Sequence, residues 1–141
     1  MSTLYAESSA VLRWLLGASD GDRVKQALAT APTVVTSELT STEVGRSLQR
    51  LVVTDQIDAG AGERVWASYS VASQHWHVYR IDDDVLLRAR QAFPREPIRT
   101  LDAIHLATAM RHAREVGAPM VLSLDRQVRA NAQALGLAII P

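Results

Sequence analysis

The sequence predicts an α/β fold, with a mostly parallel central sheet of four to five strands and helices on both faces of the sheet. Short apolar runs recur along the chain, and segments with helical spacing of apolar residues lie between them. The runs are apolar nearly throughout, which is typical of strands that are covered on both faces. The length of 141 residues fits one compact domain, so we expect a single domain over residues 1–141.

Five segments rich in Val, Ile and Leu have the length of buried strands. They are TLYA near residue 4, PTVVT at 32–36, HVYRI at 77–81, PMVLSL at 119–124 and LAII at 137–140. Apolar residues at helical spacing predict helices between them, and the stripes span residues 11–16, 44–52, 85–89 and 101–110. We expect the triplet Asp82, Asp83 and Asp84 to begin the third of these helices, where carboxylates cap the helix and complement its dipole.

The composition excludes several kinds of site. The chain has no cysteine, so disulfides, thiolate zinc sites and cysteine nucleophiles are excluded. The formal net charge is zero, and it gives no global electrostatic argument for nucleic acid. No apolar run is as long as a membrane span, and the N-terminus lacks the pattern of a signal peptide. We therefore expect a cytoplasmic protein with no membrane partner.

Four acidic residues are expected at one edge of the predicted sheet. Glu7 follows the first strand and Asp125 follows the strand at 119–124, while Glu43 and Asp102 lie early in two helices. The carboxyl ends of parallel strands meet at one edge, where ligands gather in such sheets. Clustered carboxylates repel one another unless a cation lies among them. Oxygen ligands favour Mg²⁺ or Mn²⁺ over zinc, so the four acids are candidate ligands of one of these ions.

Each acid also has a structural interpretation. Asp125 precedes RQVRANAQAL and is a good helix N-cap, and Asp102 complements a helix dipole. Residues 40–43 match a capping box, with Ser37 as the alternative start of that helix. Glu7 is then a solvated residue at a strand end. Four acids at matching topological positions favour a shared site over four separate structural roles.

Several neighbouring polar residues bear on this candidate site. Ser8, which follows the first acid, would contact the metal shell or a phosphate. Ser123 would support the last acid, and Arg99 would contact phosphate. Ser9 is expected to be the N-cap of the first helix, and Thr100 to be that of the helix over 101–110. His105 is either a general base or a packed polar residue.

Four segments together resemble the PIN-domain family. They are YAESSAVL, TSTEVGRSL, RTLDAIHLATAM and VLSLDRQVRANAQALGL. The resemblance covers essentially the whole chain and is most specific in TLDAIHLATA. Within the family, the chain most resembles the VapC-type toxins of bacterial toxin–antitoxin pairs. It implies a metal-dependent ribonuclease whose catalytic and metal-binding residues match Glu7, Glu43, Asp102 and Asp125.

The resemblance also implies a reaction and partners. Water activated by Mg²⁺ or Mn²⁺ would cleave an RNA phosphodiester, with no covalent enzyme intermediate. The partners would be an RNA such as tRNA or rRNA, a VapB-like antitoxin that blocks the pocket, and a second copy of the chain in a homodimer or a higher toxin–antitoxin assembly. Trp14, Leu15 and Leu16 would either line a groove for the antitoxin or belong to the core.

Glu7 departs from the family pattern, which usually has Asp at this position. The extra methylene lengthens the reach of the carboxylate by about 1–1.5 Å, whereas Mg²⁺ demands near-octahedral geometry. The pocket is then rebuilt around Glu7, or the metal binds through water, or the nuclease is weak. The alternative function is therefore a catalytically impaired PIN module that binds protein or RNA. A receiver-type phosphoacceptor is disfavoured, because it needs a late lysine and Lys25 is the only lysine.

Overall fold

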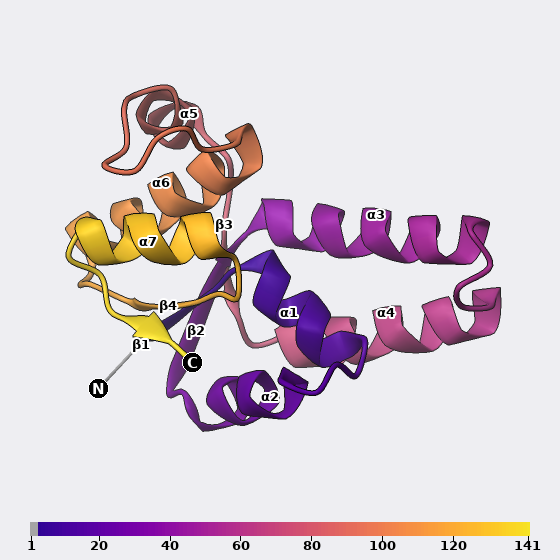
Figure 1. The fold of residues 1–141 in the computed structure, drawn as a ribbon. Coiled ribbons are helices and arrows are strands. Elements are labelled where there is room, and N and C mark those ends of the chain that lie inside the picture. Colours follow the sequence, from indigo (N-terminus) through magenta and orange to yellow (C-terminus); the bar gives the residue numbers. More distant parts are fainter. Residues whose placement is uncertain (1–2) are drawn as a thin grey trace.

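The structure, a computed structural model, describes residues 3–141 and contains one five-stranded sheet (Figure 1). The strands are β1 (Thr3–Ala6), β2 (Thr33–Ser37), β3 (His77–Tyr79), β4 (Met120–Leu122) and β5 (Ile139–Ile140). Their order is β3-β2-β1-β4-β5, and every neighbouring pair is parallel. The predicted α/β fold is confirmed, and each of the five predicted segments contributes one strand.

Seven helices connect the strands within the described residues. They are α1 (Ser8–Leu15), α2 (Gly21–Thr30), α3 (Glu38–Val53), α4 (Ala59–Ser73), α5 (Asp83–Ala89), α6 (Thr100–Glu115) and α7 (Arg126–Ala134). The four apolar stripes do not include α2, α4 or α7, and of these three only α7 is expected, from Asp125 as its N-cap. Helices α2 and α4 each bury only two residues fully.

Different helices cover the two faces of the sheet, because successive strand residues point to opposite faces. Tyr5 of β1 packs in a cluster with Leu106 of α6 and Val128 of α7. Leu4 and Ala6 of the same strand pack on the other side, in a cluster with residues of α1, α2, α3 and α4. Strands β1, β2 and β4 are therefore mostly buried, as their apolar sequences predict, whereas β3 is exposed at His77 and Val78.

Three predicted helix caps are confirmed. Ser37 caps α3 by accepting a hydrogen bond from a backbone N–H of the first turn, so this helix begins at the earlier of the two predicted places. Asp82 caps α5 by accepting from Val85 N, and it also pairs with Arg111. Asp125 caps α7 in the same way. These acids and hydroxyls satisfy N–H groups that the helices themselves leave unpaired.

Two predicted caps are wrong. Ser9 lies inside α1, and the cap of that helix is Glu7, whose carboxylate accepts a hydrogen bond from Ser9 N. The longer side chain of glutamate folds back over the first turn and takes the role expected of the serine. Thr100 is the first residue of α6, and the cap position falls on Arg99, which makes no side-chain capping bond.

The end of the first helix decides between core and groove for Trp14 and Leu15. Trp14 and Leu15 are partly buried and pack against the core cluster under α1, which confirms the core interpretation for these two residues. Leu16 is 43% exposed and does not share their burial. Among residues 3–141, no helix is both long enough and apolar enough to cross a membrane.

Candidate active site at the carboxyl edge of the sheet

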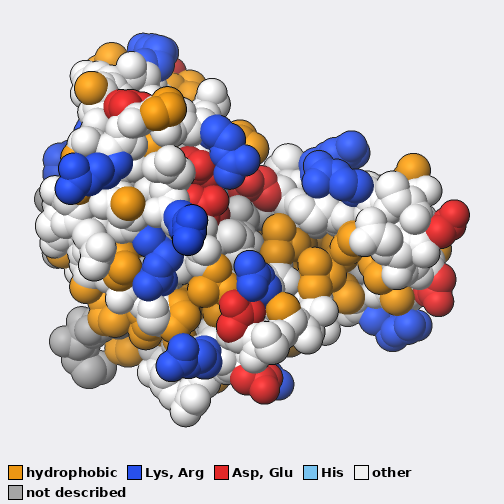
Figure 2. All heavy atoms as spheres, in the orientation of Figure 1, with side chains coloured by type: hydrophobic (Ala, Val, Ile, Leu, Met, Phe, Trp, Pro, Cys, Tyr) orange, Lys and Arg blue, Asp and Glu red, His pale blue; other side chains and the backbone are white. Residues whose placement is uncertain are grey.

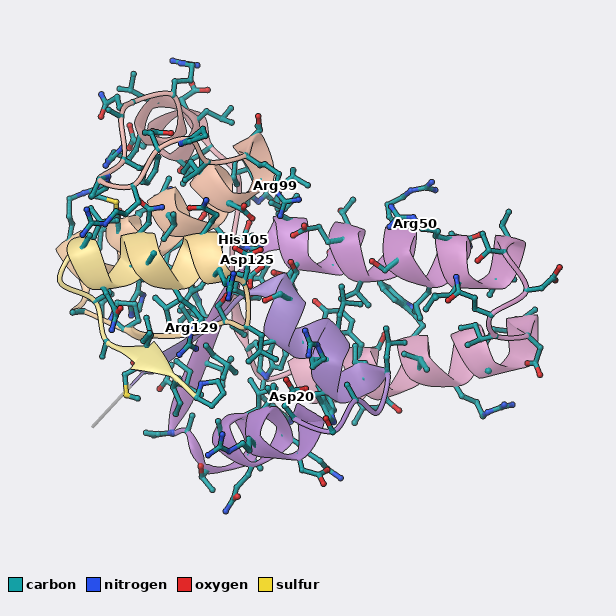
Figure 3. The ribbon with its side chains drawn as sticks, in the orientation of Figure 1. Asp20, Arg50, Arg99, His105, Asp125 and Arg129 are labelled. Carbon is teal, nitrogen blue, oxygen red and sulfur yellow. The ribbon has the colours of Figure 1, made fainter. Side chains whose placement is uncertain are left out.

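The strand order places the candidate site at β1. Strands β2 and β3 lie on one side of β1, and β4 and β5 lie on the other. Glu7 directly follows β1 and Ser123 directly follows β4, so both lie at the carboxyl edge where the sheet topology changes direction. Ligands of doubly wound sheets bind at such a switch point. Figure 3 shows Arg99, His105 and Asp125 at this place, close to the starts of α3 and α7.

Glu7 is buried and surrounded by hydrogen-bond donors. The residue is only 3% exposed. Oε1 accepts hydrogen bonds from Ser8 Oγ and Ser9 N, both at 3.1 Å. Oε2 accepts from Ser123 Oγ at 2.7 Å and from Ser9 Oγ. The interpretation of Glu7 as a solvated strand-end residue is therefore wrong, because four donors inside the protein replace water.

His105 links the first acid to the second. The residue is 1% exposed, and Nε2 lies 2.6 Å from Glu43 Oε1 and 3.4 Å from Ser8 Oγ. Nδ1 lies 2.8 Å from the hydroxyl of Tyr5. Because both ring nitrogens have partners, His105 holds the Glu43 carboxylate in place, and the packed-residue interpretation of this histidine accounts for its contacts. Tyr5 is buried as well, and burial together with the charge of Glu7 raises the pKa of its phenol well above the ordinary value.

Asp102 and Asp125 lie on either side of Arg99. Arg99 Nε is 3.4 Å from Asp102 Oδ2, and Arg99 Nη2 is 3.4 Å from Asp125 Oδ2. Burial raises the pKa of the Asp102 carboxyl, the charges of Asp125 and Glu7 raise it further, and Arg99 lowers it. Asp102 is thus a buried carboxylate under repulsion from two other acids. Ser123 connects the pairs, since its Oγ accepts from Asp125 N while it donates to Glu7.

These contacts join all four predicted acids into one network. From one end to the other, the network is Glu43, His105, Ser8, Glu7, Ser123, Asp125, Arg99 and Asp102. Figure 2 shows acidic side chains gathered where α3 meets the body, with basic side chains beside them. The three predicted supporting residues also lie in the network. Arg99 contacts carboxylates in this structure, and its expected contact with phosphate stays a prediction.

Two members of the site are not predicted by the sequence patterns. Tyr5 is expected there only as part of a strand, although a buried tyrosine hydroxyl usually has a hydrogen-bond partner, and that rule points to it. Ser9 is expected to be a cap, whereas its hydroxyl donates to Glu7 and accepts from Leu124 N. No sequence signal reveals this second role, because it depends on β4 lying beside β1.

Two of the acids can hold a hard divalent cation such as Mg²⁺, although the site has no cluster of three close ligands within the described residues. Among residues 3–141, no three His, Cys, Asp or Glu side chains converge closely enough to hold a metal ion. Mg²⁺ in phosphoryl-transfer sites, however, is usually held by one or two carboxylates together with waters and substrate phosphates. Asp102 and Asp125 can provide such a pair, and the raised pKa of Asp102 means that a positive charge would be favoured there.

A hollow lies between α3 and α4, and none of the four predicted acids lines it. Its volume is about 640 Å³, and its lining residues are Thr42, Gly45, Arg46, Leu48, Gln49, Val52, Ala59, Gly62, Glu63 and Trp66. Trp66 is 40% exposed. Figure 2 shows hydrophobic side chains along the space between these two helices. The lining carries no cluster of acids and offers shape and apolar area instead.

Nearly the whole chain is similar in sequence to known proteins. The PIN-domain model matches residues 4–138. Ribonuclease VapC46 of Mycobacterium tuberculosis is 34% identical over 140 residues, which cover 99% of this chain and 98% of that protein. Ribonuclease VapC35 of the same species is 28% identical and covers 97% of this chain and 95% of its own length.

Solved structures agree with the fold. The chain resembles a toxin–antitoxin complex from Klebsiella pneumoniae with a TM-score of 0.64 and 20% identity, covering 99% of this chain and 97% of the other. It resembles VapC20 of Mycobacterium tuberculosis, described as a toxin that cleaves the sarcin–ricin loop, with a TM-score of 0.63 and 18% identity, covering 96% of both chains. At these identities the likeness concerns the fold.

Proposed function

This chain belongs to the PIN-domain family, among its VapC-type members, and from that premise we propose that it is a metal-dependent endoribonuclease and the toxin of a toxin–antitoxin pair. The observation that supports this most directly is the network at the switch point, which joins Glu7, Glu43, Asp102 and Asp125 in one place. The ribonuclease name of the relative that is 34% identical supports the same reaction. The protein acts as a single domain over residues 1–141.

The four acids would hold Mg²⁺ or Mn²⁺. A bound ion of this kind supplies a Lewis acid that neutralises charge on the phosphoryl oxygens and makes a water more acidic. Asp102 and Asp125 are the direct ligands in this proposal, because the side chain that pairs with both of them is the exposed Arg99. Glu43 is oriented by His105 toward the same edge and completes the acidic set with Glu7.

Glu7 positions the site through its serine contacts. The longer side chain caps α1 and binds the hydroxyls of Ser8, Ser9 and Ser123. These contacts favour the first of the three alternatives, a pocket rebuilt around glutamate. In this arrangement Ser8 ties Glu7 to His105, and Ser123 ties it to the backbone of Asp125. The carboxylate therefore fixes the positions of α1, α6 and α7 at the reacting edge.

Two observations favour a second candidate, a catalytically impaired PIN module that binds protein or RNA. Both oxygens of Glu7 are already occupied by donors from the chain, and Arg99 already bridges two of the remaining acids. A titration with Mn²⁺ separates the candidates, since the impaired module would bind no divalent ion in the millimolar range or below.

We assign the two proposed partners to two places, the acidic network and the groove between α3 and α4. RNA is the substrate at the acidic network, and single-stranded loops are the expected targets because their bases are open to recognition. A VapB-like antitoxin is the protein partner, and the apolar groove between α3 and α4 is a surface that an antitoxin segment would fit. A homodimer is proposed from family membership, and the cytoplasm is the proposed compartment.

The first experiment is cleavage of total RNA by the purified chain, freed of antitoxin, with Mn²⁺ or Mg²⁺ and with EDTA as the metal-free arm. Wild-type protein is expected to cut RNA only with metal. Asp102→Asn, which keeps the size of the side chain and removes its charge, is expected to abolish cleavage while the protein stays folded. Cleavage that persists in EDTA, or in Asp102→Asn, would contradict the proposed function.

A further inference from the structure

Arg99 lies across the acidic network and is far more exposed than the acids it contacts. Its guanidinium is 3.4 Å from an oxygen of Asp102 and 3.4 Å from an oxygen of Asp125. The Arg99 side chain is 79% exposed, whereas that of Asp102 is 9% exposed. One solvent-facing cation thus neutralises two carboxylates that come from different parts of the chain, the first turn of α6 and the loop after β4 (Figure 3).

The two carboxylates are the same ones to which the proposed function assigns a divalent cation. A guanidinium and a metal ion are alternative neutralisers of the same negative charge, so each weakens the binding of the other. Both contacts of Arg99, at 3.4 Å, are longer than an ordinary hydrogen bond, and exposed ion pairs contribute little to stability. A divalent ion would therefore displace Arg99 without disturbing the fold.

A displaced Arg99 would still lie next to the two carboxylates. Its planar guanidinium matches the oxygens of a phosphate as well as those of a carboxylate. The backbone of RNA offers such phosphates on either side of the bond to be cut. Among residues 3–141, no other arginine forms ion pairs with two acids of this network.

We propose that Arg99 occupies two positions in turn: it bridges Asp102 and Asp125 in the metal-free protein, and it binds a backbone phosphate of the RNA once a divalent ion has taken its place. This inference rests on the proposed function and adds a substrate-binding residue to it. It predicts two effects of opposite sign on removing Arg99, a gain in metal affinity and a loss in RNA affinity.

Removing the Arg99 side chain leaves the helix intact. Arg99 occupies the cap position of α6, but its side chain makes no capping bond. The bond that the residue does make to the helix runs from Ala103 N to the Arg99 carbonyl at 2.9 Å, and it belongs to the backbone. Arg99→Gln therefore tests the guanidinium alone. Arg50→Gln is the matched control, since Arg50 is exposed, lies on α3 away from the network and changes the charge equally (Figure 3).

The first measurement is Mn²⁺ binding to RNA-free protein by calorimetry. Arg99→Gln is expected to bind Mn²⁺ about two- to fivefold more tightly than wild type, which is the effect of removing one exposed competing charge. The second measurement is the kinetics of RNA cleavage at several salt concentrations. Arg99→Gln is expected to raise KM about tenfold. The plot of log(1/KM) against log salt concentration is expected to become shallower by about 0.7, as for one lost phosphate contact.

The outcomes separate this inference from the function on which it rests. Tighter Mn²⁺ binding with a higher KM in Arg99→Gln, and no change in Arg50→Gln, would support it, and Arg99→Lys should then fall between wild type and Arg99→Gln. A wild type that binds Mn²⁺ and cuts RNA, beside an Arg99→Gln that behaves like Arg50→Gln, would overturn the inference alone. A wild type that does neither would overturn both.

Discussion

Glu7 differs from an aspartate by one methylene, and the structure uses that methylene to bring the carboxylate to four donors. The oxygens reach back to Ser9 and across to Ser123, which lies 116 positions later in the chain. A shorter side chain in the same backbone would not reach both. At this position, then, the extra carbon atom lets one carboxylate contact both the first turn of α1 and the residue after β4.

Glu7→Asp is expected to lower kcat/KM for RNA cleavage by about 100-fold, because displacing a positioned group by about 1 Å costs on that order. Aspartate is itself a good N-cap, so α1 keeps its cap and the loss reports on the position of the carboxylate. Cleavage kinetics with a melting curve as the folding control measure the effect. If Glu7→Asp instead gains activity, glutamate is a defect and the impaired module becomes the better description.

A second prediction at the residue scale concerns the effect of Asp102 on stability. Its pKa is higher in the folded chain than in the unfolded chain, chiefly through burial and then through Asp125. Directly above the ordinary value of 3.8, the folded chain therefore binds more protons, and stability falls as the pH rises. At neutral pH without metal, Asp102→Asn should be more stable than wild type, with a Tm gain of about 2–4 °C for each kcal/mol relieved.

Thermal melting in EDTA across pH 4–8 measures this difference between the two proteins. The gap should narrow toward acid, where Asp102 takes up a proton. Burial lowers the pKa of His112, which makes both proteins less stable in acid, and the comparison cancels that contribution. A variant that is less stable than wild type at neutral pH would mean that the Arg99 pair outweighs the burial and repulsion of Asp102.

At the scale of elements, the site depends on how α1 packs against α2. Gly21 begins α2, and a Cβ there would lie 2.7 Å from Arg13 O and 3.0 Å from Trp14 Cα. Both atoms belong to the backbone of α1 and cannot turn aside. Only glycine lets the two helices meet this closely, and their contact holds the helix that begins directly after Glu7.

Gly21→Ala is therefore expected to destabilise the protein by about 1–3 kcal/mol, the usual cost of overpacking. Urea unfolding followed by far-UV circular dichroism measures the change in free energy. Gly117→Ala is the matched control, because a Cβ at Gly117 has no atom within 4 Å among the described residues. Equal stabilities of the two variants would show that α1 and α2 can move apart without cost.

At the scale of the whole molecule, metal binding should stabilise the fold. The network links residues at or near the starts of α1, α3, α6 and α7, and an ion held by Asp102 and Asp125 would join two of these helix starts, those of α6 and α7. Binding to the folded state alone adds about 2.7 kcal/mol at a hundredfold excess over Kd. For a chain of this size that corresponds to a rise in Tm of roughly 5–11 °C.

Melting curves with Mn²⁺ and with EDTA test this prediction, and Asp102→Asn is the control. Wild type should gain stability with Mn²⁺, and the variant should gain much less because one ligand has lost its charge. The variant is thus expected to have the higher Tm in EDTA, and wild type the higher Tm in saturating Mn²⁺. A wild-type Tm that does not respond to the ion would favour the module that binds no metal.

The sequence by itself determined the layered α/β fold and the positions of the four acids along it. Apolar runs and helical stripes are local, and the end of a parallel strand is a defined place at the edge of its sheet. Glu7 and Asp125 are therefore assigned to that edge by their positions in the sequence alone. The family resemblance added the activity and partners to expect.

Only the tertiary structure decided how the acids are connected. The contacts of Glu7 with Ser123, of Glu43 with His105 and of Arg99 with Asp125 join residues that lie 116, 62 and 26 positions apart in the chain. Local patterns carry no information about such pairs, because strand order and helix packing create them. For the same reason the sequence does not predict the cap at Glu7, since its carboxylate is oriented by the residue after β4 as well as by α1.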